Sequence, residues 1–349
     1  MKITQVATAK HETVVRVEDA STNLVGYIAI HSTRLGPAAG GLRMRPYKTE
    51  AEALEDVLRL SRGMTYKNAA AGLPLGGGKA VIIGDPDTLK TPDLLRAFGR
   101  AIDTMKGRYW TAEDMGMSPS DMVEISKETQ YVAGLPGGEF ASGDPSPITA
   151  RGIFNSIRTT ARHAFGSDDL IGRKVAVQGL GHVGVHLCAM LHCVGAELIV
   201  TDIDEARVAK AVEGFGATAA DPVGILSTEA DILAPCAIGA VLNETTIPAL
   251  KVKAVCGGAN NQLKTAEDGV RLHARGILYA PDFVVNAGGI INVATEILRT
   301  QNRETWVAEK LQAVDQILAR ILSRAEQMDC SPNDVATSIV DQMIAPRAA

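Results

Sequence analysis

The stretch "VAVQGLGHVGVHL", residues 175–187, decides the fold of the second half of this chain. An apolar strand leads into Gly179, Gly181 and Gly184, which are spaced as G-x-G-x-x-G, and an apolar helical pattern follows. In such a unit the first glycine permits a tight turn, and the second lets the backbone approach a pyrophosphate. The third lets the helix pack closely on the strand. The stretch therefore predicts a dinucleotide-binding unit.

An acid at the end of the next apolar strand strengthens this interpretation. Asp202 lies 23 residues after Gly179 and directly follows the strand pattern at 197–201. A carboxylate there can accept hydrogen bonds from the adenosine ribose, and it would repel a 2′-phosphate. We therefore expect NAD rather than NADP as the cofactor. The alternative is a glycine turn in a doubly wound sheet that binds no cofactor, but strand, glycines, helix and acid all coincide here.

The rest of the chain has the pattern of an α/β protein with two domains. Helical patterns fall between some of the second-half strands, as in βαβ units with a parallel sheet. We expect a substrate-binding and oligomerisation domain over 1–145 and a Rossmann-type doubly wound NAD-binding domain over 146–324. The turn-rich segment 134–147 would link them, and helices over about 325–349 would pack back onto the first domain. The elements predicted are strands at 12–19, 24–32, 81–83, 174–178, 197–201, 231–235, 253–257 and 276–280, and helices at 49–70, 91–107, 205–216 and 308–328.

Composition narrows the function classes. The chain has 349 residues and a formal net charge of -5 without a long basic run, which argues against nucleic acid or an anionic membrane as a partner. No apolar stretch approaches the roughly 18 residues of a membrane span, and the N-terminus lacks the apolar core of a signal peptide. Five scattered cysteines without a C-x-x-C pair predict reduced thiols in a cytoplasmic protein and no metal site.

A second constellation lies in the first half. Lys79 follows three glycines and precedes an apolar run in "LPLGGGKAVIIG", residues 73–84, where we expect something to approach the backbone closely. Lys67 and Asp114 also sit among small, apolar or aromatic residues. Each could be an ordinary solvated charge. Burial, however, disfavours the charged form of a lysine, so one lysine could act as a base while the other holds a carboxylate. Such a set suits amino-acid or oxo-acid chemistry.

The chain resembles the Glu/Leu/Phe/Val dehydrogenase superfamily, and within it the leucine and phenylalanine dehydrogenase branch. The resemblance covers nearly the whole chain and implies two domains with a cleft between them, NAD as cofactor, and a cytoplasmic homo-oligomer, from dimer to octamer. The stretches that carry it are "LGPAAGGLRM", "GMTYKNAAAGLPLGGGKAVIIGDP", "GRYWTAEDMGM", "VAVQGLGHVGVHL", "APCAIGA", "GGANNQL" and "GILYAPDFVVNAGGIINVATE".

The resemblance also implies roles for matching positions. Lys67 would bind the substrate α-carboxylate, Lys79 would activate water, and Asp114 would assist proton transfer. Gly40 and Gly41 would line the substrate site, and Asn260 would contact both substrate and cofactor. Thr149 would bind the nicotinamide carboxamide. The remaining implied cofactor contacts are Gly179, Gly181, His182, Val183, Gly184, Asp202, Cys236, Ala237, Ala259, Asn261 and Asn286. For Cys236 we favour a small apolar loop residue over a nucleophile.

The implied side-chain pocket is uncharged. It comprises Ala39, Met64, Ala112, Ala133, Ile290 and Val293. A glutamate side chain would lose its water there without gaining a partner. Leucine dehydrogenases usually carry Leu at the position of Ala39 and often Thr at that of Ala133, so both differences enlarge the pocket, whereas the bulk of Ile290 resembles the branched-chain enzymes. We expect activity on leucine, isoleucine and valine, and measurable activity on methionine or phenylalanine.

The expected reaction is reversible oxidative deamination. Hydride would pass from the amino-acid Cα to nicotinamide, and Lys79 would take a proton from the water that attacks the resulting iminium. Asp114 would relay protons as ammonia leaves. A phenylalanine dehydrogenase is the nearest alternative. A glutamate dehydrogenase would need a cation near Ala39 and Val293, and a 2-hydroxy-acid dehydrogenase would need a His–acid pair. A catalytically silent dinucleotide sensor would not need Lys67, Lys79 and Asp114.

Overall fold

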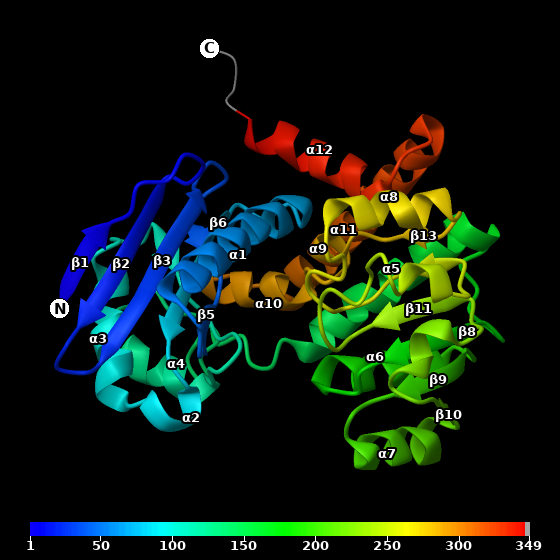
Figure 1. The fold of residues 1–349 in the computed structure, drawn as a ribbon, viewed down its shortest axis with the longest axis horizontal. Coiled ribbons are helices and arrows are strands. Elements are labelled where there is room, and N and C mark those ends of the chain that lie inside the picture. Colours follow the sequence, from blue (N-terminus) through cyan, green and yellow to red (C-terminus); the bar gives the residue numbers. More distant parts are fainter. Residues whose placement is uncertain (346–349) are drawn as a thin grey trace. The chain divides into compact units, whose positions relative to one another are not determined.

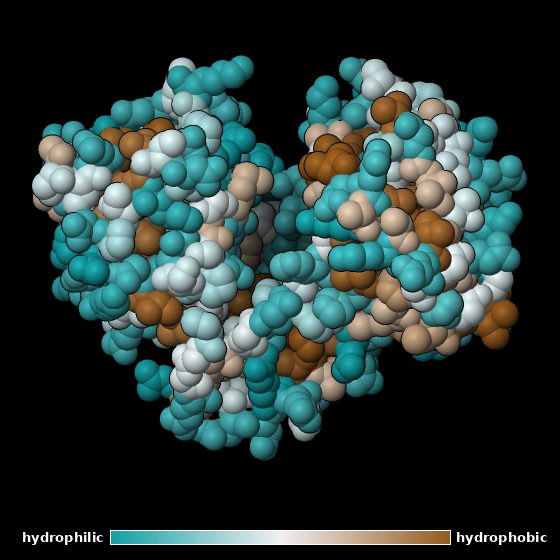
Figure 2. All heavy atoms as spheres, turned by 90° about the horizontal axis from the view of Figure 1, so that it is seen from below, coloured by the Kyte–Doolittle hydropathy of each residue, from teal (hydrophilic) through white to brown (hydrophobic). Residues whose placement is uncertain are grey.

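The computed structural model describes residues 1–345, which divide into two compact units. Unit 1 comprises Met1–Asp144 and Ile290–Ala308, and unit 2 comprises Pro145–Gly289 and Glu309–Ala345. Both units combine helices and a sheet, as the α/β prediction required (Figure 1). No helix within the described residues is long and apolar enough to cross a membrane. The face in Figure 2 is largely hydrophilic with scattered hydrophobic patches, which is ordinary for a folded protein surface.

Unit 1 is built on a mixed sheet in the order β1-β2-β3-β6-β4-β7, with β5 pairing with β6 outside this path. The β1/β2, β2/β3 and β3/β6 pairs are antiparallel, whereas β4 and β5 run parallel to β6. The strands are β1 (Lys2–Gln5), β2 (Thr13–Asp19), β3 (Leu24–Ser32), β4 (Ala38–Ala39), β5 (Leu42–Arg45), β6 (Gly76–Ile83) and β7 (Tyr109–Trp110). The helices are α1 (Glu50–Ala70), α2 (Pro86–Leu89), α3 (Pro92–Asp103) and α4 (Pro119–Ser126).

Alternation along the strands sorts the unit 1 core into two layers. Ala29 and Val81 pack with Val57 of α1 on one face of the sheet. Ile28 and Ile82 pack with Phe98 of α3 on the other face. Helix α3 begins as predicted, because the Thr91 side chain accepts a hydrogen bond from the Leu94 amide. It ends at Asp103 rather than at Gly107, which instead adopts a positive φ in the turn that follows.

Unit 2 contains a parallel sheet in the order β10-β9-β8-β11-β12-β13. Numbered within the unit this is 3-2-1-4-5-6, the strand order of a Rossmann fold. The strands are β8 (Lys174–Gln178), β9 (Glu197–Thr201), β10 (Thr218–Ala219), β11 (Ile232–Pro235), β12 (Ala254–Val255) and β13 (Leu278–Tyr279). Only the two-residue β10 has no counterpart among the predicted strands, because its residues are exposed and give no apolar signal.

The helices and short 3-10 turns of unit 2 lie before, between and after these strands. They are α5 (Ser146–Phe165), α6 (His182–Cys193), α7 (Glu205–Phe215), η1 (Gly224–Ser227), η2 (Ile247–Ala249), α8 (Ala266–Ala274), α9 (Asp282–Val285) and α12 (Pro332–Ile344). Helix α10 (Gly288–Ile297) and helix α11 (Arg303–Met328) each contribute residues to both units.

The compact units differ from the expected domains in two segments. Residues 290–308 belong to unit 1. Residues 325–345, which we expected to pack onto the first domain, belong to unit 2 instead, where α12 packs on α8 and β13. The reason is the apolar face of α12, on which Val335, Ala336, Ile339 and Val340 are buried. Residues 346–349 of the expected segment lie outside the described residues.

Candidate functional site

Lys79 is a buried cation in the middle of a central strand. Lys79 is 6% exposed. It lies in β6 on the same face of the sheet as Val81, which is the face that α1 covers. Its Nζ lies 2.8 Å from Oδ2 of Asp114, which follows β7. Because a buried charge is costly without a partner, this ion pair accounts for how the fold keeps a lysine here.

Asp114 is held by two cations rather than one. Arg43 Nε of β5 donates to the same Oδ2 at 2.9 Å, while Arg43 Nη1 reaches Asp56 of α1 at 3.2 Å. Burial alone would raise the pKa of the Asp114 carboxyl, but the charges of Lys79 and Arg43 outweigh it and hold that pKa well below its usual range. The carboxylate is therefore an ionised partner that holds Lys79 and Arg43 in place in this structure.

The glycines before Lys79 serve the packing of the protein itself. A Cβ on Gly77 would collide with Thr65 of α1, and a Cβ on Gly78 would lie 2.7 Å from the Tyr109 ring. On Gly76 it would collide with the Ser32 carbonyl. The close approach expected at this backbone is therefore made at these three positions by other parts of the protein.

Gly40 and Gly41 lie between β4 and β5, next to the paired charges. A Cβ on Gly41 would lie 2.9 Å from the Asp114 Cβ, and a Cβ on Gly40 would lie 2.9 Å from Met64 Cγ. The Tyr109 hydroxyl donates to the Gly40 carbonyl at 2.7 Å and fixes this turn. The turn thus brings Gly40, Gly41, Met64 and Asp114 together.

The other substrate-site residues of unit 1 lie on neighbouring elements. Lys67 is half-buried in the last turn of α1. Ala39 and Ala133 have no exposed surface and Ala112 is 8% exposed, so these three offer little open wall in this structure. Ile290 and Val293 on α10 are half-buried.

In unit 2 the glycine turn has the features that a bound pyrophosphate requires. Gly179 has a φ of 101°, and a Cβ there would lie 2.8 Å from that of Ala237. A Cβ on Gly184 would collide with the Gly179 carbonyl, so the third glycine permits the close packing of α6. A Cβ on Gly181, by contrast, would point into open space at the start of α6. His182 and Val183 open this helix. The turn therefore fits a dinucleotide.

Asp202 follows β9 and also has a role within the turn. Its Oδ2 accepts from the Leu180 amide at 2.6 Å, and its Oδ1 accepts from the Asp204 amide at 2.9 Å. Burial would raise the pKa of Asp202, but these amides and Arg207 lower it overall. A carboxylate oxygen can accept more than one hydrogen bond, so ribose contact remains open to it.

Of the remaining cofactor candidates in unit 2, Asn260 and Asn261 follow β12, Asn286 follows α9, and Thr149 lies on α5. Asn286 Nδ2 donates to Asn260 Oδ1 at 3.0 Å and to the carbonyls of Gly258 and Ala259, while its own Oδ1 is buried without a partner. An orphaned buried acceptor here fits a ligand donor. Asn261 adopts a positive φ. The Thr149 hydroxyl, in the first turn of α5, donates to the Pro145 carbonyl at 2.9 Å.

Cys236 directly follows β11 and is half-buried. Its Sγ would lie 3.7 Å from a Cβ on Gly258, and burial raises the pKa of this thiol to about 11. Such a thiol stays protonated at neutral pH, which supports the small apolar role over the nucleophile.

Arg43 and Tyr109 belong to this site but were not among the predicted residues. Arg43 lies within the quoted stretch "LGPAAGGLRM", yet its distance of 71 residues from Asp114 hides the contact. The alternation of β5 gives the only signal, because it buries Leu42 and Met44 and leaves Arg43 on the opposite face of the strand.

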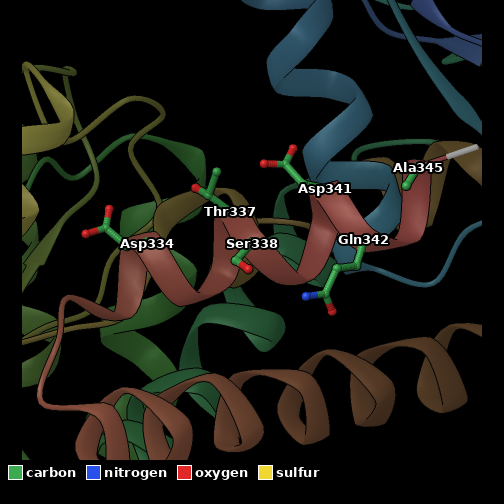
Figure 3. Close-up of a pocket in the computed structure, with 6 residues that line it drawn as sticks. All are labelled: Asp334, Thr337, Ser338, Asp341, Gln342 and Ala345. Atoms are coloured by element: carbon green, nitrogen blue, oxygen red, sulfur yellow. The ribbon is translucent and has the colours of Figure 1, made fainter.

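A shallow hollow on α12 contains none of the predicted residues. Figure 3 shows its lining, and both of its carboxylates lie on this one helix. The lining residues are Asp334, Thr337, Ser338, Asp341, Gln342 and Ala345. An acidic helix face of this kind is ordinary solvated surface.

Comparison with known proteins places both units in one group. A family described as "Glu/Leu/Phe/Val dehydrogenase, dimerisation domain" matches residues 6–131, and one described as "Glutamate/Leucine/Phenylalanine/Valine dehydrogenase" matches residues 201–341. The chain is 54% identical over 310 residues to the leucine dehydrogenase of Geobacillus stearothermophilus, covering 89% of this chain and 84% of the relative.

Two further relatives have other substrates in their names. The chain is 48% identical over 328 residues to the phenylalanine dehydrogenase of Lysinibacillus sphaericus, covering 92% of this chain and 85% of the relative. Among solved structures, L-tryptophan dehydrogenase from Nostoc punctiforme matches with a TM-score of 0.84 and 42% identity, covering 96% of each chain.

Proposed function

Because this chain belongs to the Glu/Leu/Phe/Val dehydrogenase family, we propose that it is an NAD-dependent L-amino-acid dehydrogenase. The reaction is the reversible oxidative deamination of a branched-chain amino acid, leucine first, to its 2-oxo acid and ammonia. The observation that carries the proposal is the ion pair between Lys79 and Asp114, a lysine buried in a central strand and aimed at a carboxylate. Perturbed, buried charges of this kind concentrate at functional sites.

Unit 2 would hold the cofactor. The Gly179–Gly181 turn and the N-terminus of α6 would take the pyrophosphate, and Asp202 the adenosine ribose. Asn260, Asn261, Asn286 and Thr149 would contact the nicotinamide side. Of the three glycines in the motif, only Gly181 has open space where a Cβ would lie, and this supports the assignment. Bound NAD would supply a hydride acceptor.

Unit 1 would hold the amino acid and move its protons. Lys67 binds the α-carboxylate through its ammonium group, which fixes the orientation of Cα. After the substrate is oxidised to an imine, Lys79 in its uncharged form takes a proton from the water that adds to the imine carbon. Asp114, held ionised by Arg43, then stabilises the positive charge that Lys79 gains with this proton.

A panel of L-amino acids tests this function. Purified enzyme is incubated with NAD and valine, isoleucine, leucine, methionine, phenylalanine or glutamate, and NADH formation gives kcat/KM for each. We expect the branched-chain substrates to lead and glutamate to fail. The reverse reaction should need both a 2-oxo acid and ammonium. Turnover of a 2-oxo acid without ammonium would assign a hydroxy-acid dehydrogenase instead, and binding of NADH without any turnover would assign a sensor.

Phenylalanine is the second candidate substrate. The observation that favours it is the small residue Ala39 at a pocket position. A pocket larger by a few methylene groups changes discrimination by about 1–3 kcal/mol for each group, so both substrate classes can be accepted. The same panel decides which class has the higher kcat/KM.

We further propose a cytoplasmic homo-oligomer. The match of residues 6–131 to a family described as a dimerisation domain supports self-association through unit 1. All five cysteines are free, as expected for a protein in a reducing compartment. Size-exclusion chromatography with light scattering measures the mass of the protein in solution. A monomer of 36.8 kDa would contradict the proposal.

A further inference from the structure

The carboxylate of Glu296 closes a loop of unit 1. Glu296 lies on α10, is 9% exposed, and accepts hydrogen bonds from both ends of the segment that we call the 134–142 loop. At the first end, Oε2 accepts from the Gly134 amide at 2.8 Å, and Oε1 from the Leu135 amide at 3.3 Å. At the other end, Oε2 accepts from the Ser142 amide at 3.3 Å and from its hydroxyl at 3.0 Å. One side chain thus fastens both ends of the loop.

Two neighbours complete the closure at Ser142. Asn292, one helical turn before Glu296, donates from Nδ2 to the Ser142 carbonyl at 3.1 Å. Arg303 donates to the carbonyls of Ala141 and Ser142 and to Asn292 Oδ1. A buried carboxylate is costly unless its oxygens are hydrogen-bonded, and bonds to an ionised acceptor are strong. The loop conformation and the burial of Glu296 therefore depend on each other.

The loop is joined to the proposed side-chain pocket. Ala133 directly precedes Gly134, and its amide donates to the Thr111 carbonyl at 2.8 Å. Val293 lies three residues before Glu296, so both point from the same face of α10. Glu296 therefore links two elements of the proposed pocket that are far apart in the sequence, the segment that follows Ala133 and helix α10.

We propose that Glu296 is a positioning residue for substrate selection, which fixes Ala133 relative to Val293 and so sets the size of side chain that the enzyme accepts. This inference rests on the proposed function. A wall that is fastened in part by a carboxylate shifts when the carboxylate loses its charge, and discrimination between side chains of different length follows wall position closely.

The test compares Glu296→Gln with Glu304→Gln, a control at an exposed position of α11. Glutamine is nearly isosteric but presents only one acceptor oxygen and no charge. We expect the leucine-to-valine ratio of kcat/KM to fall by about tenfold in Glu296→Gln, through KM more than kcat. The dissociation constant for NADH should stay unchanged. Ser142→Ala, which removes one of the four donors, should move the ratio in the same direction by about threefold.

Several results would overturn the inference. One is an unchanged leucine-to-valine ratio of kcat/KM in folded Glu296→Gln. Another is an equal fall in kcat/KM for every substrate, which a general loss of stability would produce. If Glu296→Gln does not fold, an unchanged ratio in Ser142→Ala has the same meaning. Amide hydrogen exchange of the 134–142 loop provides a readout without turnover, because exchange should accelerate in the folded variants. If the wild-type enzyme is inactive on the whole substrate panel, the proposed function is wrong. If amide exchange of the 134–142 loop is not faster in the folded variants, Glu296 does not hold this loop.

Discussion

Arg43 and Lys79 donate to a single oxygen atom, Oδ2 of Asp114, from two parallel strands. The strands that carry them, β5 and β6, are paired in register, with Leu42 opposite Ala80 and Arg43 opposite Val81. Arg43 and Lys79 therefore lie on one face of the sheet, on adjacent strands and two positions apart in register, and both reach the same carboxylate. Removing either one leaves the other to hold the carboxylate, so their effects on activity can be separated.

Replacement of Lys79 by alanine should abolish most turnover without loss of cofactor binding. The variant lacks the group that takes a proton from water, so we expect kcat to fall by about 10²–10⁴ while the NADH dissociation constant is kept. The control is Lys90→Ala, which also removes a lysine from an ion pair, that with Asp121, in the same unit. A kcat close to that of wild type in Lys79→Ala would exclude the catalytic role.

Replacement of Arg43 by glutamine should shift the pH profile. Burial raises the pKa of Asp114 and the two cations lower it, so loss of one cation moves this pKa upward from its depressed value. As pH falls, Asp114 should then become protonated earlier and its ion pair with Lys79 should be lost earlier. We expect the acidic limb of kcat/KM for leucine to move to higher pH. Superimposable profiles for the two enzymes would show that Arg43 does not act on Asp114.

The cofactor preference should follow from Asp202. A 2′-phosphate beside this carboxylate would meet a like charge, so wild type should favour NAD over NADP by roughly 10² or more in kcat/KM. Arg207, with Nη1 3.8 Å from Asp202 Oδ2, is exposed enough to soften the preference by turning toward a phosphate. Equal kcat/KM for NAD and NADP would show that Asp202 does not contact the adenosine ribose.

Replacement of Ala39 by leucine should narrow the substrate range. The added carbons should reduce kcat/KM for phenylalanine more than for valine. Because Ala39 has no exposed surface, we also expect a stability cost of about 1–3 kcal/mol from overpacking, visible as a lower Tm. A folded variant with an unchanged phenylalanine-to-valine ratio would remove Ala39 from the pocket.

Replacement of Asp315 by asparagine should stabilise the protein above about pH 6 but not in acid. Burial raises the pKa of Asp315 on α11 to about 6, against about 4 in an unfolded chain. A raised carboxyl pKa favours folding while the group is protonated, and this contribution is lost as pH rises from about 4 through 6. Calorimetry should show a higher Tm for the variant at pH 8 than for wild type, with little difference at pH 4. Glu309→Gln, exposed on the same helix, is the control and should show neither effect.

The elements of the fold could be predicted where local signals were strong. The glycines of 179–184 and the strand before them follow from spacing alone, and Thr91 marks the start of its helix. The packing partner of α12 could not be predicted, because an amphipathic helix indicates that one face is buried but not against what. Pairs such as Glu296 and Gly134, 162 residues apart, depend on tertiary structure that no local pattern contains.

The glycine run before Lys79 also limits what mutational scanning can report about this enzyme. Thr65, Ser32 and Tyr109 fill the space that any side chain at 76–78 would need. Substitution there should push β6 away from these neighbours and move Lys79 with it, although no reacting group is altered. A saturation screen would therefore find a loss of activity at residues 76–78 as well as at Lys79, although the three glycines take no part in the reaction. Intolerance to substitution in this strand reports steric crowding and not a catalytic role.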